Sequence, residues 1–166
     1  MNAHETLEAA VRAYFFGQRY AAVLGGIASL VMLAVAIAML VRGDAFMRGL
    51  AMVLVLIALT GAGAGAALAI CDAPKAEAMM RVTNRFSIQQ EAARMERVID
   101  NYRYYHVAFA GFACFAVILL LLTMTPTWQG VAVGLLVLAG LGVTYEHFDR
   151  QQAIIYLAAL KPSRCV

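Results

Sequence analysis

The side chains that could perform chemistry are few, and they lie near the ends of apolar segments. Five of them are carboxylates or imidazoles: Asp72, His106, Glu146, His147 and Asp149. Together they could bind a transition metal or act as a general acid and base. Their spacing matches no known ligand motif, however, and the adjacent Glu146 and His147 would point about 100° apart on a helix. The simpler interpretation is a layer of polar side chains at a membrane surface, so we predict no metal, cofactor or catalytic residue.

Composition indicates what kind of element must position these residues. The chain has 166 residues, of which 63% are hydrophobic and 14% are charged, and its mean hydropathy is +0.77. A soluble domain is usually about 45–50% apolar and roughly 25% charged. This composition is typical of a membrane protein and argues against a disordered chain or a nucleic-acid-binding domain. The three cysteines have no paired spacing, which argues against a disulfide scaffold or a zinc site.

Four apolar segments can each cross a bilayer as a helix. They lie at residues 20–41, 50–70, 107–124 and 128–145, and none contains a charged side chain. A crossing needs roughly 17–25 apolar residues, and a helix satisfies every backbone amide within the segment itself. We therefore predict one all-α domain over residues 1–166, an integral membrane four-helix bundle. The lack of ionisable groups in these segments argues against an ion-coupled carrier.

Basic residues indicate the orientation of the bundle. Eleven of the 13 lysines and arginines lie in the N-terminal tail, the segment 73–106 and the C-terminal tail, whereas Arg42 and Arg48 lie in a short turn. Cytoplasmic segments carry the excess of Lys and Arg. Both termini and the helical segment at about 73–106 are therefore predicted to be cytoplasmic.

The segment 73–106 contains the clearest amphipathic helix. Ser87 and Gln90 have the spacing of a capping box, and apolar residues then recur every three or four positions up to His106. Charged residues surround this apolar stripe. We predict that four of them form a partner-binding face: Arg94, Arg97, Asp100 and Arg103.

The second half of the chain repeats features of the first. Gly49-Leu50-Ala51-Met52-Val53 matches Gly130-Val131-Ala132-Val133-Gly134, and shorter matches pair Arg19-Tyr20 with Arg103-Tyr104 and Asp72 with Asp149. These matches predict two parallel transmembrane hairpins with the amphipathic helix between them. A shared apolar composition can also produce such matches by itself.

Small residues mark where two helices can approach closely. Gly61 and Gly65 are four positions apart in the second apolar segment, as are Gly130 and Gly134 in the fourth. Such pairs let backbones pack closely in lipid, where no hydrophobic force joins helices. We expect these glycines to lie at contacts within the bundle, with contacts between copies or a channel lining as alternatives.

Three stretches carry a resemblance to known proteins: Glu91 to Tyr105 (EAARMERVIDNYRYY), Trp128 to Leu135 (WQGVAVGL) and Asp149 to Tyr156, together with the segment around Pro74. The chain resembles, over nearly its whole length, a family of small four-span bacterial inner-membrane proteins with a cytoplasmic helix in the middle. The resemblance implies a multi-pass protein of the bacterial inner membrane. It implies no catalytic or binding residue, because no activity is established for that family.

Three classes of function remain open at this point. The favoured one is a non-enzymatic interaction protein, either an accessory subunit or an immunity-type protein that binds a membrane-acting toxin or a partner membrane protein. The second is an oligomeric pore or carrier for a small neutral solute, which the glycines of the second segment support. The third is a membrane-interface enzyme that uses the five residues named first. The expected partners are the lipid bilayer and another protein or a second copy, without nucleic acid.

Overall fold

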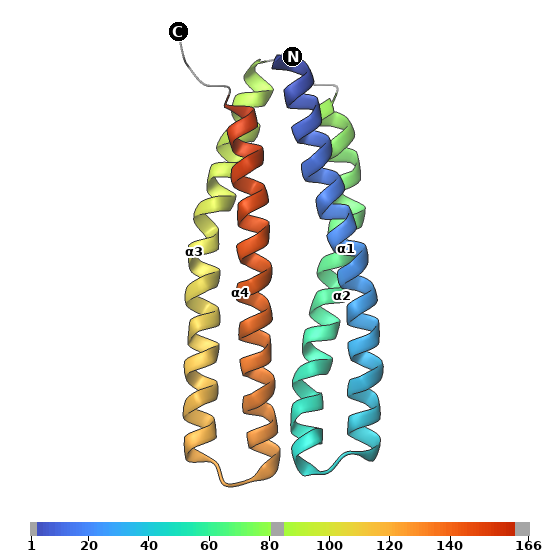
Figure 1. Ribbon diagram of the computed structural model, residues 1–166, viewed down its shortest axis with the longest axis vertical. Helices are drawn as coiled ribbons and strands as arrows, with labels where there is room; N and C mark the ends of the chain where they lie inside the picture. The colour runs from blue at the N-terminus through green and yellow to red at the C-terminus, as the bar shows by residue number, and fades with distance from the viewer. Residues whose placement is uncertain (1–2, 81–84, 162–166) are drawn as a thin grey trace.

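The computed structural model describes residues 3–80 and 85–161, and every element within that part of the chain is a helix. The helices are α1 (Ala3–Arg42), α2 (Ala45–Met80), α3 (Arg85–Leu122) and α4 (Pro126–Leu160). Figure 1 shows two antiparallel hairpins, α1–α2 and α3–α4, side by side, with both chain termini at one end. We call this the termini end and the opposite end, with the two short turns, the turn end. The prediction of four long helices is confirmed, and all four are long and apolar enough to cross a membrane.

Each helix is longer than the apolar segment inside it. Residues 107–122 form the second half of α3, and the last two residues of the predicted segment 107–124 lie in the turn that follows. The charged residues before this segment belong to the same helix. The predicted cytoplasmic segment 73–106 is therefore divided between the end of α2 and the beginning of α3, with residues 81–84 outside the described ranges. No Gly or Pro lies between Arg85 and Val107. The helix can therefore continue from the charged residues into the apolar segment, because each added residue contributes one more helical hydrogen bond.

Local sequence specifies the two turns. The Asp44 carboxylate accepts a hydrogen bond from the backbone N–H of Met47 at 2.9 Å, which satisfies one of the free amides at the start of α2. A Cβ atom at Gly43 would overlap the carbonyl oxygen of Met39, so this tight turn requires glycine. Pro126 begins α4, where the missing N–H of proline removes no helical hydrogen bond.

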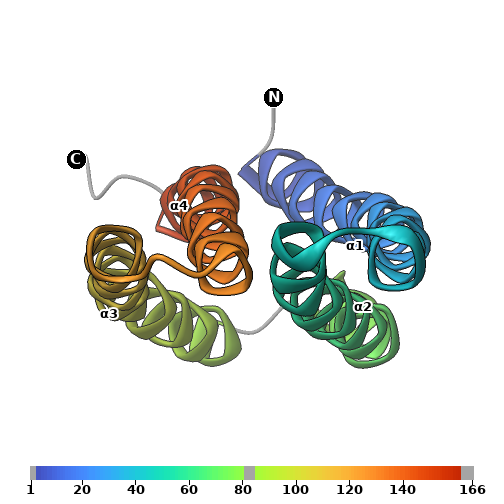
Figure 2. The ribbon, with the colours of Figure 1, turned by 90° about the horizontal axis from the view of Figure 1, so that it is seen from below.

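Helix α4 joins the two hairpins. Its Cα atoms come within 8 Å of α1, α2 and α3, whereas among the described helices α3 comes that close to α4 alone. Figure 2, viewed from the turn end, shows α3 at the outside of the arrangement and α4 next to the α1–α2 hairpin. Polar groups on α4 can therefore contact residues of both hairpins.

At the turn end, α2 and α4 touch through their backbones. A Cβ atom on Gly49 would overlap the carbonyl oxygen of Thr127, and one on Gly130 would overlap the carbonyl oxygen of Phe46. A Cβ atom on Gly134 would lie 2.7 Å from the Cβ atom of Val53. In the α1–α2 hairpin, added Cβ atoms on Gly61 and Gly65 would lie 2.7 Å from Ser29 Oγ and 3.1 Å from the Ala22 carbonyl oxygen. All four glycines singled out in the sequence thus lie where two helices meet.

The two hairpins bury corresponding positions. Four positions of α2 are buried, and so are the four positions of α4 that lie 81 residues later. They are Gly49, Ala51, Val53 and Ala58 in α2, and Gly130, Ala132, Gly134 and Ala139 in α4. In α1 and α3 the offset is 80 positions, and it relates Phe15, Ala22 and Ala36 to Met95, Tyr102 and Ala116. The match of 49–53 with 130–134 follows this register. The matches of 19–20 with 103–104 and of Asp72 with Asp149 have offsets of 84 and 77 positions and do not.

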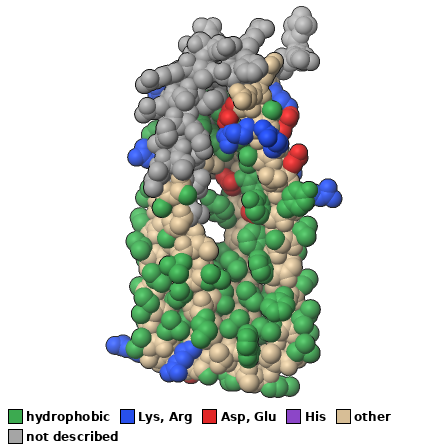
Figure 3. Space-filling view, turned by 180° about the vertical axis from the view of Figure 1, so that it is seen from behind, with side chains coloured by type: hydrophobic (Ala, Val, Ile, Leu, Met, Phe, Trp, Pro, Cys, Tyr) green, Lys and Arg blue, Asp and Glu red, His purple; other side chains and the backbone are tan. Residues whose placement is uncertain are grey.

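At the termini end, large side chains fill the space between α1, α3 and α4. This aromatic core consists of Val11, Tyr14, Phe15, Ala92, Met95, Tyr102, Ala153, Tyr156 and Leu160. The rings of Tyr14 and Tyr156 stack with their centroids 4.4 Å apart, so the contact joins α1 to α4. Figure 3 shows charged side chains near both ends of one face, with a broad band of hydrophobic side chains between them.

Candidate functional site

A network of polar side chains lies between the aromatic core and the apolar segments. It consists of Gln18 from α1, Tyr102 and His106 from α3, and Glu146 and Asp149 from α4, and we call it the polar network. Tyr102 and His106 are four positions apart, and Glu146 and Asp149 are three apart. Each pair therefore projects from one face of its helix.

Asp149 connects three helices. One carboxylate oxygen accepts a hydrogen bond from the Tyr102 hydroxyl, and the other accepts one from Gln18 Nε2 at 3.3 Å. Gln18 Nε2 also donates to the hydroxyl oxygen of Tyr14 at 2.9 Å, which links the network to the aromatic core. Burial and the hydrogen bond to Asp149 raise the pKa of Tyr102 well above its usual range, so the phenol remains a donor at neutral pH.

His106 and Glu146 form the second half of the network. Nδ1 of His106 lies 2.8 Å from the carbonyl oxygen of Tyr102, so it donates its proton to that acceptor. The same atom is 3.2 Å from Oε2 of Glu146, a residue with only 7% of its surface exposed. That carboxylate oxygen has no hydrogen-bond partner among the described residues. Nδ1 is thus engaged with the backbone of α3, and its contact with Glu146 brings α3 and α4 together at this level.

The structure brings three of the five predicted residues together: His106, Glu146 and Asp149. His147 is exposed, and its ring lies against Phe148 with the centroids 6.0 Å apart. The side chain of Asp72 lies outside the described residues. Within the ranges that the structure covers, no three His, Cys, Asp or Glu side chains are placed to hold a metal ion.

Sequence reasoning missed Gln18 and Tyr102. Tyr102 lies in the apolar stripe that ends at His106, in agreement with its 8% exposure, and the helical pattern indicates no partner for its hydroxyl. A buried tyrosine hydroxyl usually finds a hydrogen bond. That rule, applied to Tyr102, would have directed attention to a carboxylate on another helix.

The four residues of the predicted partner-binding face have different surroundings. Arg94 forms a two-pronged ion pair with Glu91, its neighbour on the same helix, with Nη2 and Oε1 2.5 Å apart. This hydrogen-bonded carboxylate raises the pKa of Arg94. Arg97, Asp100 and Arg103 are exposed, and Arg97 Nε donates to the carbonyl oxygen of Ala93 at 3.4 Å. The three exposed residues remain available to a partner.

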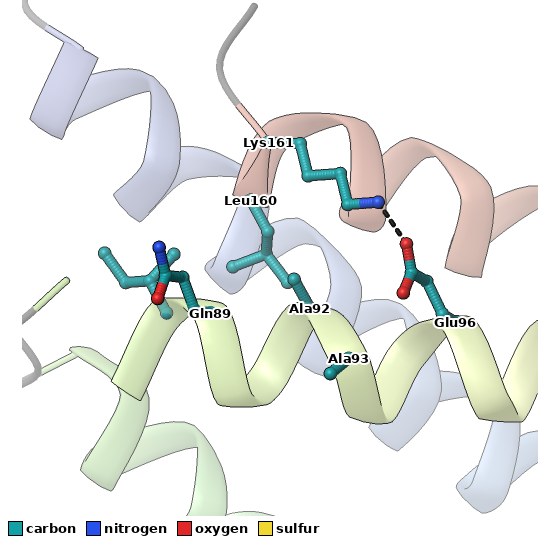
Figure 4. A pocket seen from close by; sticks show the side chains of 7 residues that line it. Gln89, Ala92, Ala93, Glu96, Leu160 and Lys161 are labelled. Carbon is teal, nitrogen blue, oxygen red and sulfur yellow. Dashed lines mark hydrogen bonds and ion pairs between the residues drawn. The ribbon is translucent and has the colours of Figure 1, made fainter. Parts of the chain in front are cut away.

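Two open cavities lie on the α3–α4 hairpin near the termini end. The first, which we call the terminal cavity, has a volume of about 590 Å³ and is lined by Ile88, Gln89, Ala92, Ala93, Glu96, Leu160 and Lys161. Figure 4 shows Leu160 pointing toward α3 near Ala92, and the ion pair between Lys161 and Glu96 at one side. The second, which we call the arginine cavity, has a volume of about 340 Å³ and is lined by Ile99, Asp100, Tyr102, Arg103, His106 and Arg150.

Comparison with known proteins adds no assignment to these features. No protein-family model, curated protein or solved structure matches this chain. The function must therefore be argued from the side chains themselves.

Proposed function

We propose that the chain is a multi-pass protein of the bacterial inner membrane with both termini in the cytoplasm. Large apolar side chains on the apolar segments point outward: Leu30 is 66% exposed and Leu121 is 76% exposed. Exposed apolar surface of this extent is stable in lipid and unfavourable in water. The excess of Lys and Arg at the termini end supports the orientation.

We further propose that the bundle consists of two repeated hairpins. The support is the offset of 80 or 81 positions between buried residues of the two hairpins, together with the reciprocal contact at the turn end. Gly49 faces Thr127 while Gly130 faces Phe46. Gly130 lies 81 positions after Gly49, and Thr127 lies 81 positions after Phe46, so each contact is the counterpart of the other. A two-fold relation between parallel repeats would produce this reciprocity.

The function that these features support best is binding of another polypeptide, as an accessory subunit or an immunity-type protein. The observation that carries this proposal is the terminal cavity on the cytoplasmic end. Ile88, Ala92 and Leu160 provide apolar lining, and Gln89, Glu96 and Lys161 provide polar groups around it. Apolar pockets with a polar rim receive the anchoring side chains of protein partners. The exposed Arg97 on the same helix extends the polar surface available to the partner.

Cross-linking in intact host cells tests this proposal. A photoreactive phenylalanine analogue at Gln89, which lines the terminal cavity, should attach to one second polypeptide of defined mass. The same analogue at Val143, an exposed position on the apolar part of α4, should not produce that species.

Two matched tryptophan substitutions on α3 make the test specific. Ala93→Trp fills the terminal cavity from an exposed position and should abolish the cross-link. Asn101→Trp, also exposed but outside the cavity, should preserve it. A cross-link that survives Ala93→Trp would contradict the proposal, and a cross-link to a second copy of the chain would favour the oligomeric alternative.

A further inference from the structure

The arginine cavity contains two guanidinium groups that the fold does not use. Arg103 from α3 and Arg150 from α4 both line it and are exposed. Among the residues that the structure describes, neither is in an ion pair. Asp100 is the one acidic side chain in the lining, and the hydroxyl of Tyr102 is already donated to Asp149. The side chains that line the cavity therefore carry a net positive charge that a bound anion could neutralise. The carboxylates next to it, Asp149 and Glu146, contact Tyr102 and His106 of the lining and leave the two arginines unpaired within the described part of the chain.

The position of the cavity along the helices indicates what kind of anion would reach it. His106, in its lining, directly precedes the apolar segment 107–124, and Arg150 follows the segment 128–145 by five residues. Three tyrosines near this level point outward, with exposed fractions of 74% for Tyr104, 54% for Tyr105 and 55% for Tyr145. Tyrosine is enriched where a membrane meets water, because its ring is apolar and its hydroxyl is polar. In the proposed membrane placement, the cavity opens at the depth of the lipid headgroups.

We propose that the arginine cavity binds an anionic phospholipid of the cytoplasmic leaflet, with a headgroup such as phosphoglycerol. The lipid phosphate lies between the guanidinium groups of Arg103 and Arg150, which bind phosphate through paired N–H donors. A headgroup hydroxyl can donate to the Asp100 carboxylate, which would repel a second negative charge. The acyl chains continue along exposed apolar side chains such as Val107, which directly follows the cavity and is 68% exposed.

This apolar continuation favours a lipid over a soluble phosphate. A free phosphate ion would gain the two arginines alone, and both are open to solvent. A phospholipid gains the same charge contacts while its chains remain in the bilayer. The inference rests on the proposed membrane placement, but it does not depend on the polypeptide partner proposed above.

Native mass spectrometry can measure the preference for this lipid. The detergent-solubilised protein is incubated with an equal mixture of phosphatidylglycerol and phosphatidylcholine, and the ratio of the two bound lipids is determined. The full chain should bind phosphatidylglycerol preferentially. Each arginine removed should reduce the preference about five-fold, so the double variant Arg103→Gln/Arg150→Gln should lose most of it.

The control variant Arg19→Gln/Arg97→Gln removes the same charge from exposed positions at the same end of the bundle, outside the cavity. It should keep the preference of the full chain. An equal loss in both double variants would overturn the proposal, because it would indicate general charge attraction. Competition by inorganic phosphate that removes the preference would also overturn it, in favour of a soluble anion.

An independent measurement separates this inference from the membrane placement. Host membranes are washed with alkaline carbonate, which releases proteins that only adhere to the surface. Release of the chain would overturn the membrane placement and, with it, the lipid site. Retention in the membrane without a preference for phosphatidylglycerol would overturn the lipid site alone.

Discussion

The two ends of the bundle hold their helices together with side chains of different size. At the turn end the buried residues are small, and Ala51, Ala116 and Ala132 are fully inaccessible. At the termini end the largest fully buried side chains are Tyr156 and Met95. The exposed surfaces differ in the opposite way, since leucine and valine cover the outside of the apolar segments and charged residues cover much of the termini end.

This difference is what two different solvents would select. In water, burying a large apolar side chain stabilises a fold, so the aromatic core is the arrangement expected for the part of the bundle that the proposed placement leaves outside the membrane. In lipid, an apolar side chain gains nothing by moving from the surface to the interior. Helices there associate where small residues allow close backbone contact. The polar network lies between these two parts of the bundle. On one side of it the helices pack through aromatic rings, and on the other they pack through glycine and alanine.

The largest effect is expected from truncating the centre of the aromatic core. Tyr156→Ala should reduce the free energy of unfolding by about 4 kcal/mol, because it removes a buried ring that stacks on Tyr14 and leaves a cavity. The matched variant Tyr156→Phe should be nearly neutral, since the hydroxyl has no hydrogen-bond partner among the described residues. Unfolding in detergent, followed by circular dichroism, measures both. A destabilised Tyr156→Phe would mean that the hydroxyl has a partner.

The second largest effect is expected at the turn end, from adding a single methyl group to a glycine. Gly130→Ala should reduce the free energy of unfolding by about 2–3 kcal/mol, because the added methyl group overlaps the carbonyl oxygen of Phe46 and must push α2 away from α4. Gly140→Ala adds the same methyl group to the same helix at a position where, apart from the neighbouring residues and backbone of α4 itself, no atom lies within 4 Å. It should be neutral or stabilising by up to about 1 kcal/mol, as alanine favours a helix over glycine. Equal losses of stability in the two variants would contradict the view that close backbone contact holds the helices together at the turn end.

Much of the fold could be predicted from the sequence because hydropathy and helix periodicity are local signals. Each of the four apolar segments lies in one of the four helices, apart from residues 123–124 in the turn after α3. The short turn predicted between Arg42 and Arg48 is the connection between α1 and α2. The sequence did not indicate that the amphipathic helix and the third apolar segment are one helix. A change from charged to apolar composition resembles a boundary between elements, although the backbone has no reason to break there.

The candidate site was less predictable because it depends on which helices are neighbours. His106, Glu146 and Asp149 were found from their residue types, and the structure brings them together with Gln18 and Tyr102. Gln18 is a surface-type residue in a charged tail, and only the packing of α1 against α4 makes it a partner of Asp149. The imidazole of His147 has suitable chemistry, but its direction on α4 leaves it exposed.

The smallest loss of stability is expected in the polar network, between the aromatic core and the apolar segments. Tyr102→Phe leaves the ring in place and removes the hydrogen bond to Asp149, so it should reduce the free energy of unfolding by about 1.5 kcal/mol. Tyr104→Phe, on the same helix at a position that is 74% exposed, should change it by less than about 0.5 kcal/mol. The same unfolding assay measures both. If Tyr102→Phe were as mild as Tyr104→Phe, the network would not contribute to holding α3 against α4.

The pH dependence of stability sharpens this last prediction. Burial and the bond to Asp149 raise the pKa of Tyr102 in the folded chain, so folding favours the protonated phenol. This contribution is fully present below the pKa of an unfolded tyrosine, about 10, and is lost as the pH rises above it. Tyr102→Phe should therefore flatten the alkaline decline in stability, while Tyr104→Phe should leave it unchanged. If the stability of Tyr102→Phe declined at alkaline pH as much as that of the unchanged chain, Tyr102 would not cause the decline. Other buried tyrosines of the aromatic core, such as Tyr156, would then be responsible.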